Sequence, residues 1–159
     1  MKKYGFTLIE LIFVIILMGV LTGVGFYMAQ PDATKQDAQY TLLKLKEARY
    51  RAIGYETGDG SCSEAGWIVL NEGNLSSNES PTHTIKSEIK LPTITTLANT
   101  TPHKPETVCF DSLGRPHDGN TTSLVSLIRN PLDINFTKSD KNTTIRLFPQ
   151  TGYAIIPCK

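Results

Sequence analysis

The chain has 159 residues and a formal net charge of +1, with 16 lysines and arginines against 15 aspartates and glutamates. This balance gives no sign of a strongly basic nucleic-acid-binding protein or of a polyacidic tail. About 130 residues follow the apolar N-terminal stretch, which is enough for one domain with one hydrophobic core.

An apolar stretch from Phe6 to Ala29 dominates the start of the chain, and Glu10 is its single charge. About 20 apolar residues at a rise of about 1.5 Å each cross the roughly 30 Å hydrocarbon core of a bilayer. A helix satisfies its own backbone donors and acceptors, which lipid cannot do. The stretch therefore predicts a membrane-spanning helix over residues 6–30.

Glu10 is the unusual residue of this helix, because it lies inside the apolar run. A charged aspartate at a helix centre costs roughly 2.5–3.5 kcal/mol on insertion scales, and a glutamate should cost a similar amount. Two interpretations are open. The carboxylate either reaches the membrane edge or is a buried charge that awaits a cationic partner.

The segment before Glu10 reads KKYGFTLI, and its basic head predicts a cytoplasmic N-terminus. An ordinary secretory signal has an apolar core of about 7–15 residues followed by a small-residue cleavage site. Here the apolar run is longer, and the small residue, Gly5, precedes it. This arrangement resembles the class III signal of type IV pilins and pseudopilins.

The resemblance implies that a prepilin peptidase cleaves between Gly5 and Phe6 and that the new N-terminal Phe6 is methylated. It also implies that Glu10 meets the freed N-terminal amine of a neighbouring subunit during filament assembly. In a medium of low dielectric constant, an ammonium and a carboxylate relieve each other's desolvation. The partners implied are other pilin or pseudopilin subunits, the prepilin peptidase and an inner-membrane assembly platform.

Residues 31–54 have the pattern of an amphipathic helix. The residues that recur at three- and four-residue steps are Ala38, Leu42, Leu45, Ala48 or Arg49, and Ala52. This helix is expected to continue the membrane segment as one long helix, whose second half lies on a sheet. Pro31 removes one backbone hydrogen bond and predicts a kink or an interruption of that helix.

A change to a period of two predicts a β-rich domain over residues 55–159. Strands are expected at 66–70, 84–91, 107–110, 124–128, 134–137, 143–148 and 153–157, with loops at 71–83 and 98–106. Residues 149–152 are expected to join the last two strands as a hairpin. Along the chain, the predicted segments are a leader at 1–5, the two helical segments and then the strands. This order predicts an α+β fold with a long N-terminal helix packed on an antiparallel sheet domain.

Three stretches of the β-rich domain carry a second resemblance: GWIV at 66–69, VCF followed by GRP at 108–116, and TIRL followed by TGY at 144–153. They look like the GspH/FimT branch of minor pilins. The resemblance implies an H-type minor pseudopilin of a type II secretion pseudopilus. The alternative is a type IV pilus minor pilin of the FimT/FimU type, involved in pilus priming or DNA uptake.

Both alternatives imply a single-pass protein of the bacterial inner membrane with a periplasmic globular domain, which later enters a pilus or pseudopilus. Nucleic-acid binding has thin support, because only Lys138, Lys141 and Arg146 cluster late in the chain.

The sequence gives no catalytic residues, no metal site and no cofactor, and therefore argues against an enzyme. Three histidines lack metal-ligand spacing and are expected in solvated loops: His83, His103 and His117. Four aspartates lack the spacing of a calcium loop and are expected in turns: Asp111, Asp118, Asp133 and Asp140.

The cysteines Cys62, Cys109 and Cys158 all follow the predicted membrane helix. An oxidising periplasm permits a disulfide, and an odd number leaves one thiol over. A bond of Cys158 with Cys109 or Cys62 is favoured, because it would fasten the chain terminus to the sheet.

Three asparagines open an N-x-S/T sequon with an acidic residue two positions before: Asn74, Asn120 and Asn142. This pattern resembles the extended acceptor of bacterial N-glycosylation systems. Chance matches are the alternative in a chain rich in asparagine and threonine.

Overall fold

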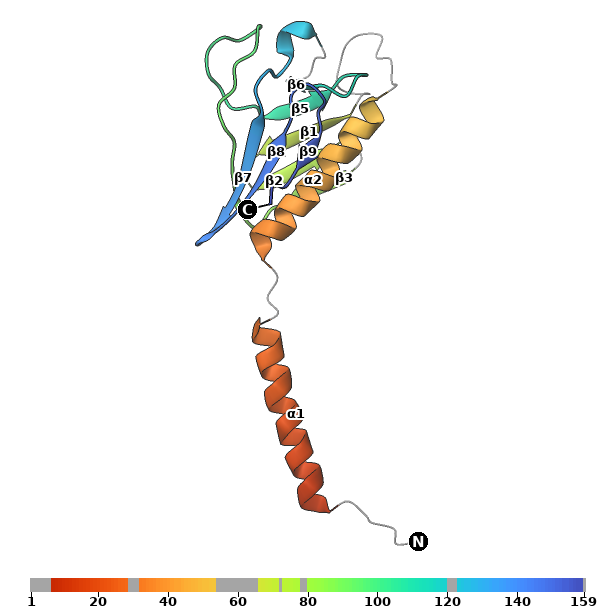
Figure 1. The fold of residues 1–159 in the computed structure, drawn as a ribbon, viewed down its shortest axis with the longest axis vertical. Helices are drawn as coiled ribbons and strands as arrows, with labels where there is room; N and C mark the ends of the chain where they lie inside the picture. The colour runs from red at the N-terminus through yellow and green to blue at the C-terminus, as the bar shows by residue number, and fades with distance from the viewer. Residues whose placement is uncertain are drawn as a thin grey trace. The chain divides into compact units, whose positions relative to one another are not determined.

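The computed structural model of the chain describes residues 7–28, 32–53, 66–71, 73–77, 80–119 and 123–158. The chain divides into two units, Met1–Asp32 and Ala33–Lys159. The first contains helix α1, and the second, called the globular unit below, contains helix α2 and the described strands (Figure 1).

Helix α1 covers Leu8–Met28 and holds most of the apolar stretch in its 21 residues. It begins with hydrogen bonds from the backbone N–H groups of Glu10 and Leu11 to the Thr7 carbonyl, at 3.1 and 3.2 Å. At a rise of about 1.5 Å per residue the helix is about 32 Å long. Its length and composition are those of a helix that can cross a membrane.

Helix α2 covers Ala33–Ala52 and is separate from α1, because Asp32 is not helical. The described residues therefore contain two separate helices, where the sequence predicted one long helix with a kink or an interruption at Pro31. The residue before Asp32 in the sequence is a proline, which has no N–H group to donate and disfavours helical geometry in the residue preceding it. Pro31 itself lies outside the described residues.

The described strands form two antiparallel sheets. The first sheet has the order β3-β2-β1-β5-β6, with strands Ser80–Thr84, Asn74–Ser77, Trp67–Asn71, Thr107–Phe110 and Pro116–Asp118. The second has the order β4-β7-β8-β9, with strands Glu88–Lys90, Leu132–Lys138, Lys141–Leu147 and Ala154–Ile155. A helix followed by antiparallel strands confirms the predicted α+β class.

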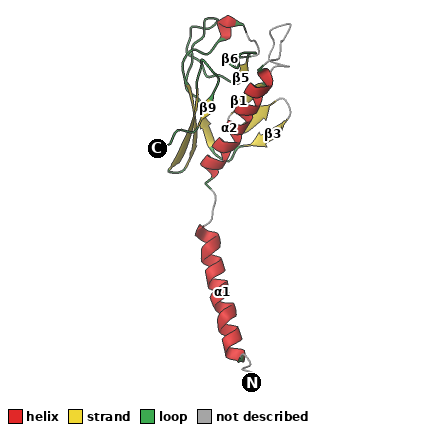
Figure 2. Cartoon of the chain, turned by 45° about the vertical axis from the view of Figure 1, so that its right-hand side comes forward, coloured by secondary structure: helices red, strands yellow, loops and turns green. Residues whose placement is uncertain are grey.

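One face of α2 is buried against both sheets, as Figure 2 shows. The helix contacts β1, β2 and β5 of the first sheet and β7, β8 and β9 of the second. Ala38, Leu45, Ala48 and Ala52 are at most 4% exposed, which confirms the predicted apolar face. Small side chains on this face let the helix approach the strands closely. The helix is therefore the element that joins the two sheets.

The core contains the inward residues of both sheets, of which Phe110 and Phe136 are the largest fully buried ones. Along β7, Leu132, Ile134 and Phe136 are buried and alternate with more exposed residues. This alternation of buried and more exposed residues has the period of two that the sequence predicted for the strands, and it is typical of a sheet with one face toward solvent.

Two stretches differ from their predictions. The polar segment 71–83, expected as a loop, contains β2 and most of β3. Leu75 is the buried apolar residue of β2, so the apolar period that marks a strand is almost absent there. Residues 124–128, expected as a strand, contain the 3-10 helix η1, Leu124–Ser126, which begins after Ser123.

Two glycine turns meet at one end of the globular unit. Gly152, in the β8–β9 turn, has φ +60°, and its N–H donates to the Phe148 carbonyl at 2.8 Å. A Cβ atom on Gly152 would lie 1.9 Å from the carbonyl oxygen of Gly114, in the β5–β6 turn. Both the left-handed backbone and the missing space require glycine at this position.

We expect the substitution Gly152→Ala to lower the free energy of unfolding by about 3 kcal/mol, since it adds both overpacking and left-handed strain. Chemical denaturation of the detergent-solubilised chain, followed by circular dichroism, measures the loss. Gln150→Ala, at an exposed position of the same turn, is the matched control and should change stability by less than about 0.5 kcal/mol. Equal stability of the Gly152→Ala protein would contradict this account of the turn.

Candidate functional site

The apolar surface of α1 has no cover within the described chain. Its large apolar side chains from Leu8 to Val24 are between 41% and 76% exposed. Around Gly19, Gly23 and Gly25, a Cβ atom would meet no atom within 4 Å. Glycines allow helices to approach closely in lipid. A surface of this size and polarity requires lipid or other helices around it.

Glu10 lies in the first turn of α1 and is exposed there, among apolar neighbours on both sides. The helix dipole favours an acid in this turn by about 0.3–1 kcal/mol. A charged side chain costs roughly 2.5–3.5 kcal/mol at the centre of a membrane helix and less near its end, where Glu10 lies. No side chain of the described residues pairs with Glu10. Whether Glu10 reaches the membrane edge or pairs with a cation from outside this helix stays a prediction.

The other predicted residues of this site, Gly5 and Phe6, lie outside the described residues, as does Pro31. The structure therefore neither brings Phe6 and Glu10 together nor separates them. It gives the position of Glu10, three residues after the Thr7 carbonyl that begins the helix.

A buried polar network fixes the β5–β6 turn of the globular unit, and sequence reasoning missed it. His117 is fully buried, with Nε2 3.3 Å from Asp111 Oδ2 and Nδ1 3.1 Å from Ser126 Oγ. The order Ser–His–Asp has the form of a catalytic triad. However, Ser126 Oγ donates to the Ser123 carbonyl at 2.7 Å, and all three side chains are buried. The network is suited to holding η1 and the turn together.

Asp111 is the centre of this network. Its Oδ1 accepts hydrogen bonds from the backbone N–H groups of Leu113 and Arg115, at 3.0 and 2.7 Å, and its Oδ2 accepts from Arg115 Nε at 2.7 Å. Burial raises the pKa of Asp111, but the hydrogen bonds from Arg115 and His117 outweigh burial, so the pKa lies below its ordinary value.

The prediction of solvated loop histidines is wrong for the residues that the structure describes. His117 is in β6 and has no exposed surface. His103 forms a bridge with Ile94 and places Nε2 2.5 Å from Asp118 Oδ2, and this hydrogen bond raises the pKa of His103. His83 is in β3, with its ring 4.1 Å from that of Tyr40 on α2. These partners lie between six and about forty residues away in the sequence and follow no fixed spacing, so spacing alone could not reveal them.

A second buried carboxylate, Asp37, attaches α2 to the segment before β4. Its Oδ2 accepts hydrogen bonds from the backbone N–H groups of Lys86 and Ser87 and from Ser87 Oγ, at 2.8–2.9 Å. The sequence contained one signal for it. Asp37 stands one turn before Thr41 and two turns before Leu45, on the buried face of the helix.

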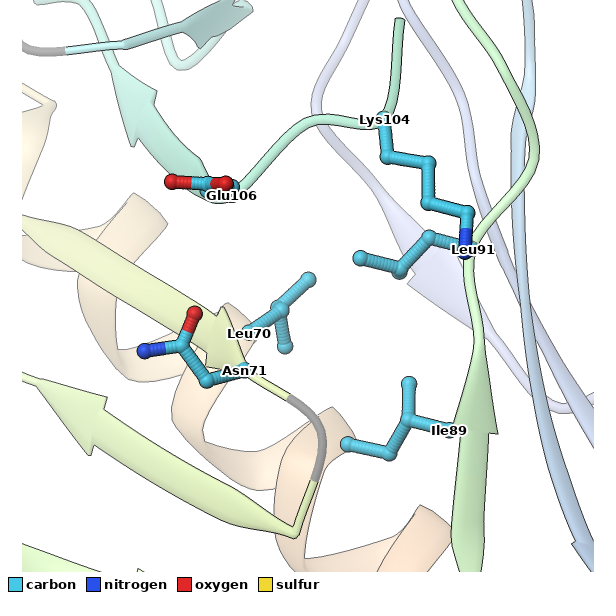
Figure 3. Close-up of a pocket in the computed structure, with 6 residues that line it drawn as sticks. All are labelled: Leu70, Asn71, Ile89, Leu91, Lys104 and Glu106. Carbon is cyan, nitrogen blue, oxygen red and sulfur yellow. The ribbon is translucent and has the colours of Figure 1, made fainter.

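A cavity of about 190 Å³ lies between the ends of β1 and β4, where the two sheets meet (Figure 3). Leu70, Ile89 and Leu91 point toward one another across it. Lys104 and Glu106 belong to its lining and have opposite charges. The described residues contain no group of three or more histidines, cysteines or carboxylates that could hold a metal ion. Three apolar and three polar side chains line this cavity.

The cysteines differ from their predicted pairing. Cys109 is disulfide-bonded, whereas Cys158 is a free and exposed cysteine. The prediction that Cys158 takes part in the disulfide is therefore wrong. The turn after β9 leaves Cys158 at the surface, while Cys109 is buried in β5. Cys62, the remaining cysteine of the sequence, lies outside the described residues.

Two of the three sequon asparagines are described, and both are exposed near hairpin turns. Asn74 is the first residue of β2, and Asn142 is the second residue of β8. Asn120 lies outside the described residues. Exposure leaves room for a sugar at either position, and modification itself stays a prediction.

Comparison with known proteins gives one family match. The family described as the prokaryotic N-terminal methylation motif, the class III signal of type IV pilins, matches residues 1–26. This match includes Gly5, Phe6 and Glu10 and supports a type IV pilin-like, prepilin-type protein. No curated protein and no solved structure matches the chain.

We expect the stabilising contribution of Asp111 to depend on pH, because its pKa is lowered in the folded state. Its contribution is present above the unfolded pKa, which is about 3.9 for an aspartate, and is lost as pH falls through the folded pKa. Asp111→Asn should lower the free energy of unfolding by about 2 kcal/mol at pH 7. The difference in this free energy from the unsubstituted protein should shrink as the pH falls below about 4.

Denaturation of both proteins across this pH range measures the effect. Asp133→Asn is the control, because Asp133 and Arg146 form an ion pair that is partly exposed. It should cost no more than about 1 kcal/mol at any pH. A cost of Asp111→Asn that stays constant from neutral to acid pH would contradict the role given to its charge.

Proposed function

We propose that the chain is a minor structural subunit of a filament of the type IV pilin kind. After cleavage between Gly5 and Phe6 and methylation of Phe6, α1 is stored in the bacterial inner membrane. It then leaves the membrane to pack among the corresponding helices of neighbouring subunits. The observation that carries this proposal is an uncovered apolar helix whose single acid lies within a matched N-terminal methylation motif.

The physical argument concerns the charge of Glu10. Cleavage after Gly5 would create an ammonium group at Phe6, four residues before Glu10 in the sequence. An ammonium and a carboxylate in a lipid-like medium attract each other strongly, and each removes the other's cost of burial. Pairing between neighbouring subunits would therefore make insertion into a helix bundle favourable only in the correct axial register.

The finer proposal is an H-type minor pseudopilin of a type II secretion pseudopilus. The three segments that resemble this branch cover the first part of β1, most of β5 with the β5–β6 turn, and the second half of β8 with the β8–β9 turn. In the fold, β1 pairs with β5, and the two hairpin turns meet at Gly114 and Gly152. Their proximity supports a shared structural motif. A type IV pilus minor pilin of the FimT/FimU type is the alternative, and neighbouring genes distinguish the two.

DNA uptake, which belongs to the alternative, needs an exposed basic patch. Of the predicted cluster, Arg146 donates two hydrogen bonds of 2.8 Å to Asp133, so its charge is offset. No observation on the described residues favours DNA binding over filament assembly.

Intact mass and N-terminal sequencing of the protein from its native host test the processing step. We expect the polypeptide to begin at Phe6 and to carry one added methyl group. The same mass reports any glycan on Asn74, Asn120 or Asn142, and a mass equal to the processed and methylated polypeptide would exclude glycosylation. A native protein that retains Met1 and its two lysines would overturn the proposed function.

Glu10→Val should leave membrane insertion intact, because it makes α1 more apolar. It should reduce recovery of the protein in sheared filaments by at least about tenfold, since loss of the ion pair costs more than about 1.4 kcal/mol. Leu11→Val is the matched control and should assemble normally. Membrane fractionation and immunoblotting measure both steps. Normal assembly of the Glu10→Val protein would show that Glu10 has no such role.

A further inference from the structure

A cavity of about 290 Å³ opens at the end of the globular unit where α2 finishes. Three turns form it: the β5–β6 turn, the segment between η1 and β7, and the β8–β9 turn. Its lining residues are Arg115, Leu127, Ile128, Arg129, Pro149 and Gln150. Figure 1 shows η1 and β6 together at this end of the unit.

The floor of the cavity is apolar and fixed. Ile128 is 1% exposed, Pro149 is buried, and Leu127 is half-buried. The N–H group of Ile128 donates to the Pro116 carbonyl at 3.0 Å, and Leu127 forms a bridge with His117 of β6. Because the backbone is tied to β6, the floor is already formed before any ligand binds.

Two guanidinium groups belong to the lining, and no carboxylate does. Arg115 is held in place, since its Nε donates to Asp111 Oδ2 at 2.7 Å while 30% of its side chain stays exposed. Among the described residues, its terminal nitrogens have no other partner. Arg129 is exposed and has no hydrogen bond or ion pair with any described residue. Asp111 offsets one of the two charges, so the cavity keeps an excess of positive charge.

We propose that this cavity binds a carboxylate carried beside an apolar side chain of a partner protein. Guanidinium groups bind carboxylates through parallel hydrogen bonds, and the apolar floor accepts the neighbouring side chain. The volume is at the lower limit of small-molecule pockets, which begin at about 300 Å³. It therefore suits one or two side chains of a protein better than a larger ligand. This proposal goes beyond filament assembly and does not depend on it.

The carboxylate has two possible sources, an acidic side chain within the partner or its C-terminus. Three peptides with blocked N-termini distinguish these two sources. The first has an internal leucine–glutamate pair and a blocked C-terminus. The second ends in leucine with a free carboxylate, and the third is the second peptide with its C-terminus converted to an amide. Titration of the detergent-solubilised, isotope-labelled full chain with each peptide, followed by NMR, reports binding through the amide signals of Arg129 and Gln150.

We expect the NMR signals of Arg129 and Gln150 to shift saturably with at least one of the two peptides that carry a carboxylate. The peptide with the amidated C-terminus should bind at least tenfold more weakly. Arg129→Gln should weaken the acidic peptide at least tenfold, and Arg129→Lys should weaken it less, because it keeps the charge but loses the planar fork. Arg146→Gln, at an arginine paired with Asp133 on the second sheet, is the control and should bind normally.

Thermal unfolding checks that the Arg129 variants remain folded, as expected for an exposed side chain. The proposal would be overturned if the amidated peptide bound as tightly as the peptides with a carboxylate. It would also be overturned if Arg129→Gln left peptide binding unchanged, or if neither carboxylate peptide shifted the NMR signals. None of these results depends on leader cleavage or on filaments, so they leave the proposed function untouched.

Discussion

A single carboxylate on an uncovered apolar helix is the constraint on which the rest of the molecule depends. The side chains of α1 have no partner in the described chain, and the helix dipole offsets only part of the cost of charging Glu10. The helix is therefore stable in lipid or among other helices but not in water. Under the proposed function, its acid adds a requirement for a cation at a defined height along the helix. The helix would then determine both the surroundings of the chain and its axial register among neighbouring subunits.

The globular unit obeys a different constraint, because it has to join two antiparallel sheets through one helix. Small apolar residues on α2 provide the close contact, and Asp37 adds a directional bond to the segment before β4. Asp111 holds the β5–β6 turn through hydrogen bonds with Leu113, Arg115 and His117. Buried carboxylates of this kind are stable only because backbone and side-chain donors surround them.

The sequence predicted what depends on local pattern and missed what depends on contacts across the chain. The apolar run of α1, the small-residue face of α2 and the alternation along β7 each appear within one segment. The strands β2 and β3 were missed because their outward residues are polar and Leu75 alone marks the buried face. His117 was misjudged because its burial depends on how the β5–β6 turn and η1 fold back onto it, where Asp111 and Ser126 become its partners. The disulfide of Cys109 was likewise decided by tertiary position.

The contact between Gly114 and Gly152 limits how this end of the molecule can diverge among relatives. A side chain in place of Gly152 would collide with the Gly114 carbonyl, and one in place of Gly114 would press on Arg49 and Ile53 at the end of α2. Both turns supply walls of the arginine-lined cavity. The lengths of these two turns are therefore constrained, while exposed positions such as Arg129 and Gln150 stay replaceable. Selectivity for different binding partners would then evolve by exchange of single side chains on an unchanging frame.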